Sequence, residues 1–162
     1  MTAILIIYTF DFNKYHKNLI VKKYKAMAKN ESTNEISVSG NKKIKTLQKE
    51  FNKKFPFIRI ALYPDSAKKI VAKGGTITQL DGEQTLASVR RENTSGSISI
   101  SGNKKVSTLE QEFDKVFGLY CQVCYTSSDD HRYYTGSSED QKTLHSLNES
   151  KEAAGCKKNE WR

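Results

Sequence analysis

The feature that most constrains the fold is an internal duplication. Residues 36–55 and 98–117 align at an offset of 62, and 13 of the 20 aligned positions are identical. A second match pairs the Thr-Leu-Ala-Ser-Val that starts at Thr85 with the Thr-Leu-His-Ser-Leu that starts at Thr143, now at an offset of 58. Chance does not produce such a match, whereas duplication of one structural unit does. The two predicted modules are residues 36–93 and 94–148.

Both copies show the same two periods. Ile36-Ser-Val-Ser and Ile98-Ser-Ile-Ser alternate apolar and polar residues, which predicts a half-buried strand. Apolar residues then recur at helical spacing and predict one amphipathic helix in each copy. Pro56 and Gly118 are expected to end these helices. The apolar positions are Ile44, Leu47, Phe51 and Phe55 in the first copy and Val106, Leu109, Phe113 and Phe117 in the second.

Two further strands and a helix are expected after each amphipathic helix. Ile58, Ile60 and Leu62 alternate in the first copy, as Leu119, Cys121 and Val123 do in the second, one residue out of step with the helix alignment. A third strand is predicted at 76–80 and at 132–135, and a closing helix at 85–91 and at 143–148. The predicted fold class is therefore α+β, with two tandem βαββα modules that form a pseudo-symmetric unit.

The segments outside the modules have a different composition. Residues 1–35 predict an N-terminal extension, with a strand over 1–10, a lysine-rich amphipathic helix over 12–29 and a linker. Residues 149–162 predict a polar tail. The apolar run at the start lacks the basic leader and cleavage site of a secretory signal, and the three cysteines are an odd number, which suits a reducing compartment. We therefore expect a cytoplasmic protein with no membrane contact.

Positive charge is concentrated in the first half of the chain. Residues 1–75 contain 16 lysines and arginines against 5 acidic residues, a net charge of +11, and the remainder carries −2. Such an imbalance favours contact with a polyanion or with an acidic protein surface. The alternative is that lysine only keeps the surface soluble.

The most specific motif is Ser-Gly-Asn-Lys-Lys, which occurs between the first strand and the helix of each copy. A helix N-terminus offers free N–H groups and a partial positive charge, so lysines there favour binding of an anion. Alternatively, the helix begins later, with Thr46 and Thr108 as N-caps, and the lysines lie in an exposed loop. The candidate binding residues are Asn41, Lys42, Lys43, Lys45, Asn103, Lys104 and Lys105.

No catalytic or metal-binding pattern is supported. Cys121 and Cys124 have zinc-like spacing, but residues three apart in a strand point to opposite faces. Glu50 and Glu112 recur beside core phenylalanines, where a helix usually has its solvated flank. The three histidines lie outside the repeated motif, so no base is specified for a nucleophile. We expect no catalytic residues, no metal and no small-molecule cofactor.

The string Ser-Gly-Asn-Lys-Lys-Val-Ser-Thr-Leu-Glu-Gln-Glu-Phe and the later Thr-Leu-Ala-Ser-Val-Arg resemble a set of short uncharacterised bacterial proteins. In that family the Thr-Leu-x-x-Glu-Phe helix and the Thr-Leu-Ala-Ser ending recur, and the resemblance covers both copies, about two thirds of the chain. The Asp-rich turn usual before Thr-Leu-Ala-Ser is altered in both copies. The resemblance implies that each copy is a module of this family, and it implies no activity.

These observations favour a non-enzymatic binding protein that contacts a nucleic-acid backbone or an acidic protein through its basic first half. One alternative is a protein-interaction or inhibitor module of a mobile element or phage that does not bind nucleic acid. A second is a small enzyme with an unrecognised site. Salt dependence separates the first two, because phosphate contacts weaken steeply as salt rises.

Overall fold

The computed structural model describes residues 35–91 and 95–158. The expected N-terminal strand and basic helix, and the last four residues of the expected tail, lie outside the described residues. From Glu35 onward the chain groups as one compact unit that includes both copies. The described residues form a mixed α+β fold with six helices and two small antiparallel sheets. In chain order the elements are β1 (Ile36–Ser39), α2 (Ile44–Lys54), β2 (Arg59–Pro64), α3 (Ala67–Ala72), α4 (Leu86–Val89), β3 (Ser97–Ile100), α5 (Val106–Phe117), β4 (Leu119–Thr126), β5 (Arg132–Tyr134), α6 (Ser137–Asp140) and α7 (Leu144–Ala153).

Both sheets combine strands from the two copies. β1 pairs with β3 in antiparallel orientation, with Ser37 opposite Ser99. The second sheet has the order β2-β4-β5, and Ala61 lies opposite Gln122. The first strand of one copy therefore pairs with the first strand of the other, and the second strand with the second.

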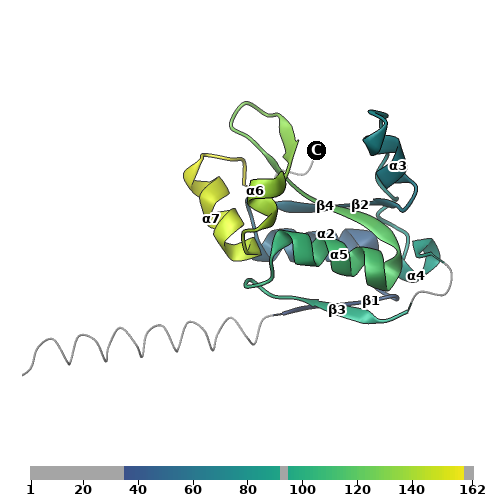
Figure 1. Cartoon of the computed structure of the whole chain (residues 1–162). Helices are drawn as coiled ribbons and strands as arrows, with labels where there is room; N and C mark the ends of the chain where they lie inside the picture. Colours follow the sequence, from purple (N-terminus) through teal and green to yellow (C-terminus); the bar gives the residue numbers. More distant parts are fainter. Residues whose placement is uncertain (1–34, 92–94, 159–162) are drawn as a thin grey trace, which may run out of the picture. The chain divides into compact units, whose positions relative to one another are not determined.

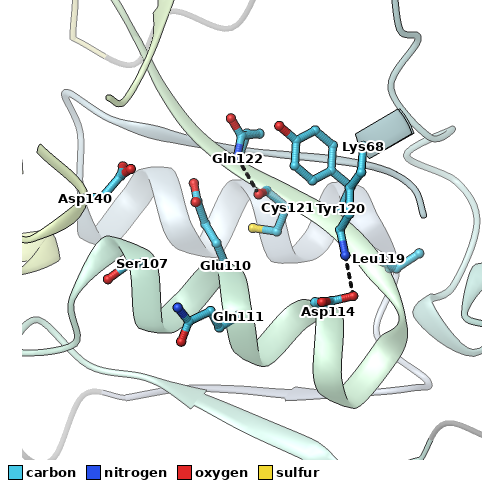
Figure 2. A pocket seen from close by; sticks show the side chains of 10 residues that line it. All are labelled: Lys68, Ser107, Glu110, Gln111, Asp114, Leu119, Tyr120, Cys121, Gln122 and Asp140. Carbon is cyan, nitrogen blue, oxygen red and sulfur yellow. Dashed lines mark hydrogen bonds and ion pairs between the residues drawn. The ribbon is translucent and has the colours of Figure 1, made fainter. Parts of the chain in front are cut away.

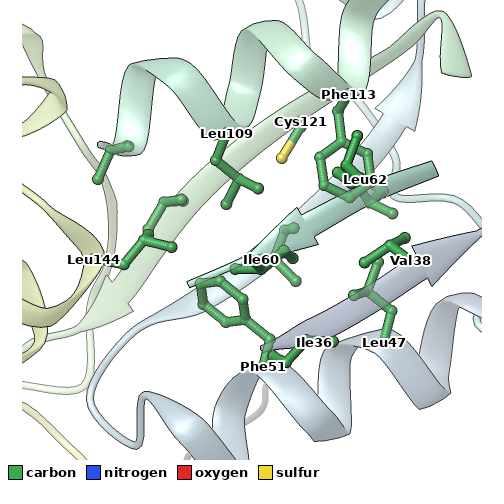
Figure 3. Packing of buried hydrophobic residues seen from close by; sticks show 14 of the residues in the cluster. Ile36, Val38, Leu47, Phe51, Ile60, Leu62, Leu109, Phe113, Cys121 and Leu144 are labelled. Atoms are coloured by element: carbon green, nitrogen blue, oxygen red, sulfur yellow. The ribbon is translucent and has the colours of Figure 1, made fainter. Parts of the chain in front are cut away.

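The two long helices lie between the two sheets (Figure 1). α2 and α5 pass between the β1–β3 pair below and the β2–β4 pair above, so their apolar stripes face a single core. Figure 3 shows Leu47 and Phe51 from α2 and Leu109 and Phe113 from α5 converging on strand residues such as Ile60. All eight predicted stripe positions are at most 2% exposed, which confirms the helical period.

The predicted helix ends are confirmed, for two different reasons. α5 stops at Gly118, whose φ of 60° lies in the left-handed region that glycine adopts without steric cost. An added Cβ there would also lie 2.5 Å from the Cβ of Arg91. α2 ends at Lys54, two residues before Pro56, which cannot continue a helix.

The third strand forms only in the second copy. β5 pairs with the end of β4 because the short turn at 127–131 returns the chain directly to the strand it has just left. In the first copy α3 follows β2 instead, and the chain regains the edge of β2 only where the Leu80 N–H donates to the Leu62 carbonyl. The prediction of a strand at 76–80 was therefore wrong, and the βαββα pattern is incomplete in the first module.

The expected polar tail begins later than residue 149. α7 continues to Ala153, and Lys151 and Cys156 are buried, at 8% exposure each. The Lys151 ammonium pairs with Glu139 and lies 3.4 Å from the centre of the Tyr125 ring. These contacts hold the end of α7 against the second sheet, so residues 149–156 belong to the fold.

Replacing Phe51 or Phe113 by alanine should destabilise the protein by about 3–5 kcal/mol, since both rings are fully buried and a cavity would remain. Chemical denaturation of each variant measures this free energy directly. Lys53→Ala on the exposed side of α2 is the matched control and should change stability by less than about 0.5 kcal/mol. An unchanged unfolding midpoint in both phenylalanine variants would contradict the core assignment.

Candidate functional site

The repeated Ser-Gly-Asn-Lys-Lys motif lies directly before the long helix of each copy. α2 begins at Ile44 with Lys43 as its N-cap, so the helix starts before Thr46. The N–H groups of Ile44 and Lys45, which a bound anion would use, donate instead to the carbonyl oxygens of Gln84 and Gly82. In the second copy the Val106 N–H likewise donates to the carbonyl of Lys142. These helix starts are occupied by the protein's own backbone.

The same motif holds the closing helix of each copy in place. The N–H of Leu86 donates to the Lys42 carbonyl at 3.0 Å, and the N–H of Ala87 to the Gly40 carbonyl at 2.7 Å. The second copy repeats both bonds, from Leu144 to Lys104 and from His145 to Gly102. A Cβ on Gly40 would lie 3.2 Å from the Cβ of Ala87, so a close approach of the two segments favours glycine. This mutual backbone bonding gives the motif a structural reason to recur.

One lysine of each motif is committed to an internal ion pair. Lys42 lies 2.5 Å from Glu50, and its counterpart Lys104 pairs with Glu112. The two lysine side chains are 18% and 14% exposed, so little of either charge is open to a partner. Glu50 and Glu112, which the sequence placed on a solvated flank, are 41% and 34% exposed, and they are the residues that hold these lysines.

The other predicted binding residues remain accessible. Lys43 and Lys45 both pair with Glu83, and their side chains are 50% and 44% exposed. In the second copy the Lys105 ammonium lies 3.5 Å from a side-chain oxygen of Gln141. Asn41 and Asn103 are exposed at the tips of their loops. The structure thus brings together Lys43 and Lys45, and it turns Lys42 and Lys104 inward.

The exposed side of α2 carries a basic groove. Its volume is about 190 Å³, and its described lining is Lys45, Gln48, Lys49 and Asn52. The amide group of Gln48 donates to the carbonyl of Ile60 in β2, and that of Asn52 donates to the carbonyl of Ile58 just before β2, each at 3.3 Å. The described lining of the groove therefore consists of two lysines and of two amide side chains whose N–H groups already donate to backbone carbonyls.

The equivalent side of α5 carries an acidic cavity of about 310 Å³ (Figure 2). Ser107, Glu110, Gln111 and Asp114 stand here in the positions that Lys45, Gln48, Lys49 and Asn52 occupy in α2. The remaining lining residues are Lys68, Leu119, Tyr120, Cys121, Gln122 and Asp140. The same helix face is thus basic in one copy and acidic in the other.

Glu110 is the most perturbed carboxyl of the described residues. It accepts a hydrogen bond from the Val123 N–H at 3.0 Å, which favours the charged form. Burial outweighs that bond and, with help from the charge of Asp140, raises the pKa of Glu110 to about 7. At the other end of the cavity Asp114 lies 2.5 Å from the ammonium of Lys68. Sequence reasoning missed this cavity; the replacement of Gln48 and Asn52 by Glu110 and Asp114 was the available indication.

Tyrosines line a third groove on the outer face of the second sheet. The hydroxyls of Tyr63 and Tyr134 lie 2.6 Å apart, and the rings of Tyr63 and Tyr120 pack at a centroid distance of 6.0 Å. Burial, assisted by the hydrogen bond to Tyr134, raises the pKa of Tyr63 well above its usual value. The groove has a volume of about 420 Å³ and shares Tyr120 and Gln122 with the acidic cavity.

The cysteines point to different sides of β4, as the strand period predicts. Cys121 belongs to the main core, whereas Cys124 packs against Ala61 and Tyr63 on the other face. Burial raises the pKa of Cys121, and it raises that of Cys124 to about 11. In the part of the chain that the structure describes, no three His, Cys, Asp or Glu side chains are placed to share a metal ion.

Comparison with protein families, with curated proteins and with solved structures gives no significant match. Among residues 35–91 and 95–158, none of the helices has the length and apolar character needed to span a bilayer.

Replacing Glu110 by glutamine should raise the melting temperature at pH 8. Because the pKa of Glu110 is higher in the folded protein than in the unfolded chain, the stabilisation from the protonated carboxyl is complete below about pH 4.5 and is lost as the pH rises through about 7. The neutral glutamine escapes that loss and can still accept from Val123. Thermal unfolding between pH 4.5 and 8 should show a difference that grows with pH.

The control is Glu112→Gln, which removes the same charge from the same helix but breaks the pair with Lys104. It should show no stabilisation at pH 8. If Glu110→Gln and the wild type melt together at every pH, Glu110 does not carry a raised pKa.

Proposed function

We propose that this is a non-enzymatic binding protein that contacts a polyanion, such as a nucleic-acid backbone, or an acidic protein surface through the exposed side of α2. The observation that carries the proposal is the groove of about 190 Å³ with Lys45 and Lys49 on its rim. Two lysines of the basic first half, Lys45 and Lys49, thus lie together on one side of one helix.

The lysines around this groove outnumber the acids that neutralise them. Lys45, Lys49 and Lys53 follow one another at intervals of four residues and so lie along one side of α2. Lys43 precedes them at the helix start, and Glu83 is the acid that pairs with Lys43 and Lys45. A row of one sign steers an oppositely charged partner and strengthens its encounter. On α5 the corresponding row is Ser107, Gln111 and Lys115, which carries a single positive charge.

The proposed framework for this surface is a pair of modules related by an approximate two-fold axis. Ser37 and Ser99 are equivalent positions of the duplication and face each other in one sheet. Ala61 and Gln122, equivalent once the one-residue shift is included, face each other in the other sheet. An axis through both pairs would exchange α2 and α5 and would carry the basic groove onto the acidic cavity.

Side-chain chemistry supports binding rather than catalysis. The raised pKa values of Cys121 and Cys124 keep these thiols protonated near neutral pH, and a thiol is a weak nucleophile compared with a thiolate. His131 and His145 are exposed and pair with Asp129 and Glu149, away from both cysteines. The buried free thiols also suit the reducing conditions of the cytoplasm, where we propose the protein acts.

Replacing Lys49 and Lys53 by glutamine should weaken binding to duplex DNA of any sequence, because phosphate contacts carry no base information. Titrations at several salt concentrations should show the slope of log affinity against log salt shrinking by roughly 0.9 per contact removed. Neither lysine takes part in the ion pairs described above, so the double variant should fold normally.

The matched control replaces Lys105 and Lys115 of the second copy by glutamine, which lowers the net charge by the same two units as the test variant. If both double variants lose affinity to the same extent, charge alone acts and the α2 groove is not the site. If the unmodified protein fails to bind DNA at about 50 mM salt, the polyanion is excluded. An acidic protein partner would then be the surviving form of the proposal.

A further inference from the structure

The backbone direction of β4 identifies an unpaired half of its edge. The Val123 carbonyl accepts from the Thr135 N–H at 3.0 Å, and the Val123 N–H donates to Glu110, so both groups point away from β2. Alternate residues of a strand share the direction of their backbone groups, so those of Cys121 and Leu119 also point away from β2. β5 pairs only with Cys124–Thr126 and does not reach this stretch. The outward backbone of Leu119 and Cys121 therefore borders the acidic cavity, which both residues line.

The corresponding edge in the first copy is closed. There the carbonyls of Ile58 and Ile60 receive the amides of Asn52 and Gln48, and that of Leu62 receives the Leu80 N–H. The carbonyl just before β2 and two outward carbonyls within β2 are thus satisfied from within the module. Capping of this kind keeps an edge strand from pairing with another chain.

Two substitutions on α5 open the edge in the second copy. Asp114 stands at the position of Asn52 and, having no N–H to donate, turns to the Lys68 ammonium instead of a strand carbonyl. Glu110 stands at the position of Gln48 and can only accept when charged, so it takes the Val123 N–H. Among the described residues, the Cys121 carbonyl then accepts from the side chain of its neighbour Gln122, at 3.0 Å (Figure 2).

Among the described residues that line the cavity beside this open edge, the positive group is Lys68, which lies at the Asp114 end. Lys68 balances Asp114. Toward the other end Glu110 and Asp140 repel each other electrostatically. Oδ1 of Asp140 is buried and has no hydrogen-bond partner among the described residues. A cation placed between the two carboxyls would satisfy that oxygen and favour the charged form of Glu110.

We propose that the groove between α5 and the Leu119–Val123 edge binds an extended peptide segment of a partner protein that carries a lysine or arginine. The segment adds to β4 where β5 stops, and its main chain bonds the outward groups of Leu119 and Cys121. Its basic side chain lies between Glu110 and Asp140. This site is separate from the basic groove on α2 and does not depend on the function proposed for that groove.

The test is an NMR titration of the ¹⁵N-labelled full chain with the pentapeptide acetyl-Thr-Val-Lys-Val-Thr-amide at pH 8. The expected result is saturable shifts of the backbone amides from Leu119 to Val123. Two further peptides separate the two kinds of contact. Norleucine in place of lysine keeps the four-carbon side chain but removes its charge, and a peptide N-methylated at both valines and at the lysine keeps the charge but blocks main-chain pairing along either edge.

Glu110→Gln combined with Asp140→Asn should weaken binding of the lysine peptide by about tenfold or more, because each substitution removes a charged hydrogen-bond acceptor. Glu112→Gln is the control for net charge, since Glu112 lies on α5 but is not among the residues that line the cavity. This control should bind like the wild type.

Equal affinity for the lysine and norleucine peptides would overturn the charge recognition. Equal affinity for the lysine peptide and its N-methylated form, or for n-butylammonium alone, would overturn the strand addition. An absence of shifts from Leu119 to Val123 at millimolar peptide would overturn the site as a whole. Binding at pH 8 that falls as the pH drops below about 7, where Glu110 gains a proton, would support it.

Discussion

Pairing between the two copies completes both sheets, and the rest of the structure depends on it. Among the described residues, neither β1 nor β2 has a partner strand within the first copy, and a lone strand forms no sheet. In the first sheet β1 finds its partner in β3, and in the second β2 finds its partner in β4. α2 and α5 can then bury their phenylalanines in a core that both copies enclose. The grooves lie beside the same strands, so they too exist only when the pairing is made.

The amphipathic helices could be predicted from the sequence because a strong apolar period occurs twice. The third strand at 76–80 could not, because the short segment Thr76-Ile-Thr-Gln-Leu80 does not reveal whether a sheet edge is within reach. In the first copy the chain forms α3 after β2, and of the residues 76–80 it is Leu80 whose N–H bonds to β2, at the Leu62 carbonyl. Pairing is a property of the whole module, whereas a helical stripe is local.

The candidate sites were less predictable than the fold. Lys42 and Lys104 looked like anion ligands because they stand at a helix start, but the distance to Glu50 or Glu112 spans two turns of helix and is not visible in a motif. Glu110 was not among the residues predicted from the sequence. Its character comes from burial and from the Val123 amide, both of which depend on the position of β4. A comparison of the two copies, position by position, would have drawn attention to it.

The cross-pairing of the copies also governs how the chain can fold during synthesis. Within the described residues, the partner strands of β1 and β2 both lie in the second copy, so contacts that complete the core have high contact order and form late. While the ribosome is still making residues beyond 93, β3 and β4 are not yet available to the first copy. β1 and β2 are then unpaired, and the apolar stripe of α2 is exposed to solvent. Exposed strand edges and apolar stripes are where nascent chains aggregate. The lysines of this copy would repel neighbouring nascent chains during that interval, which opposes their association.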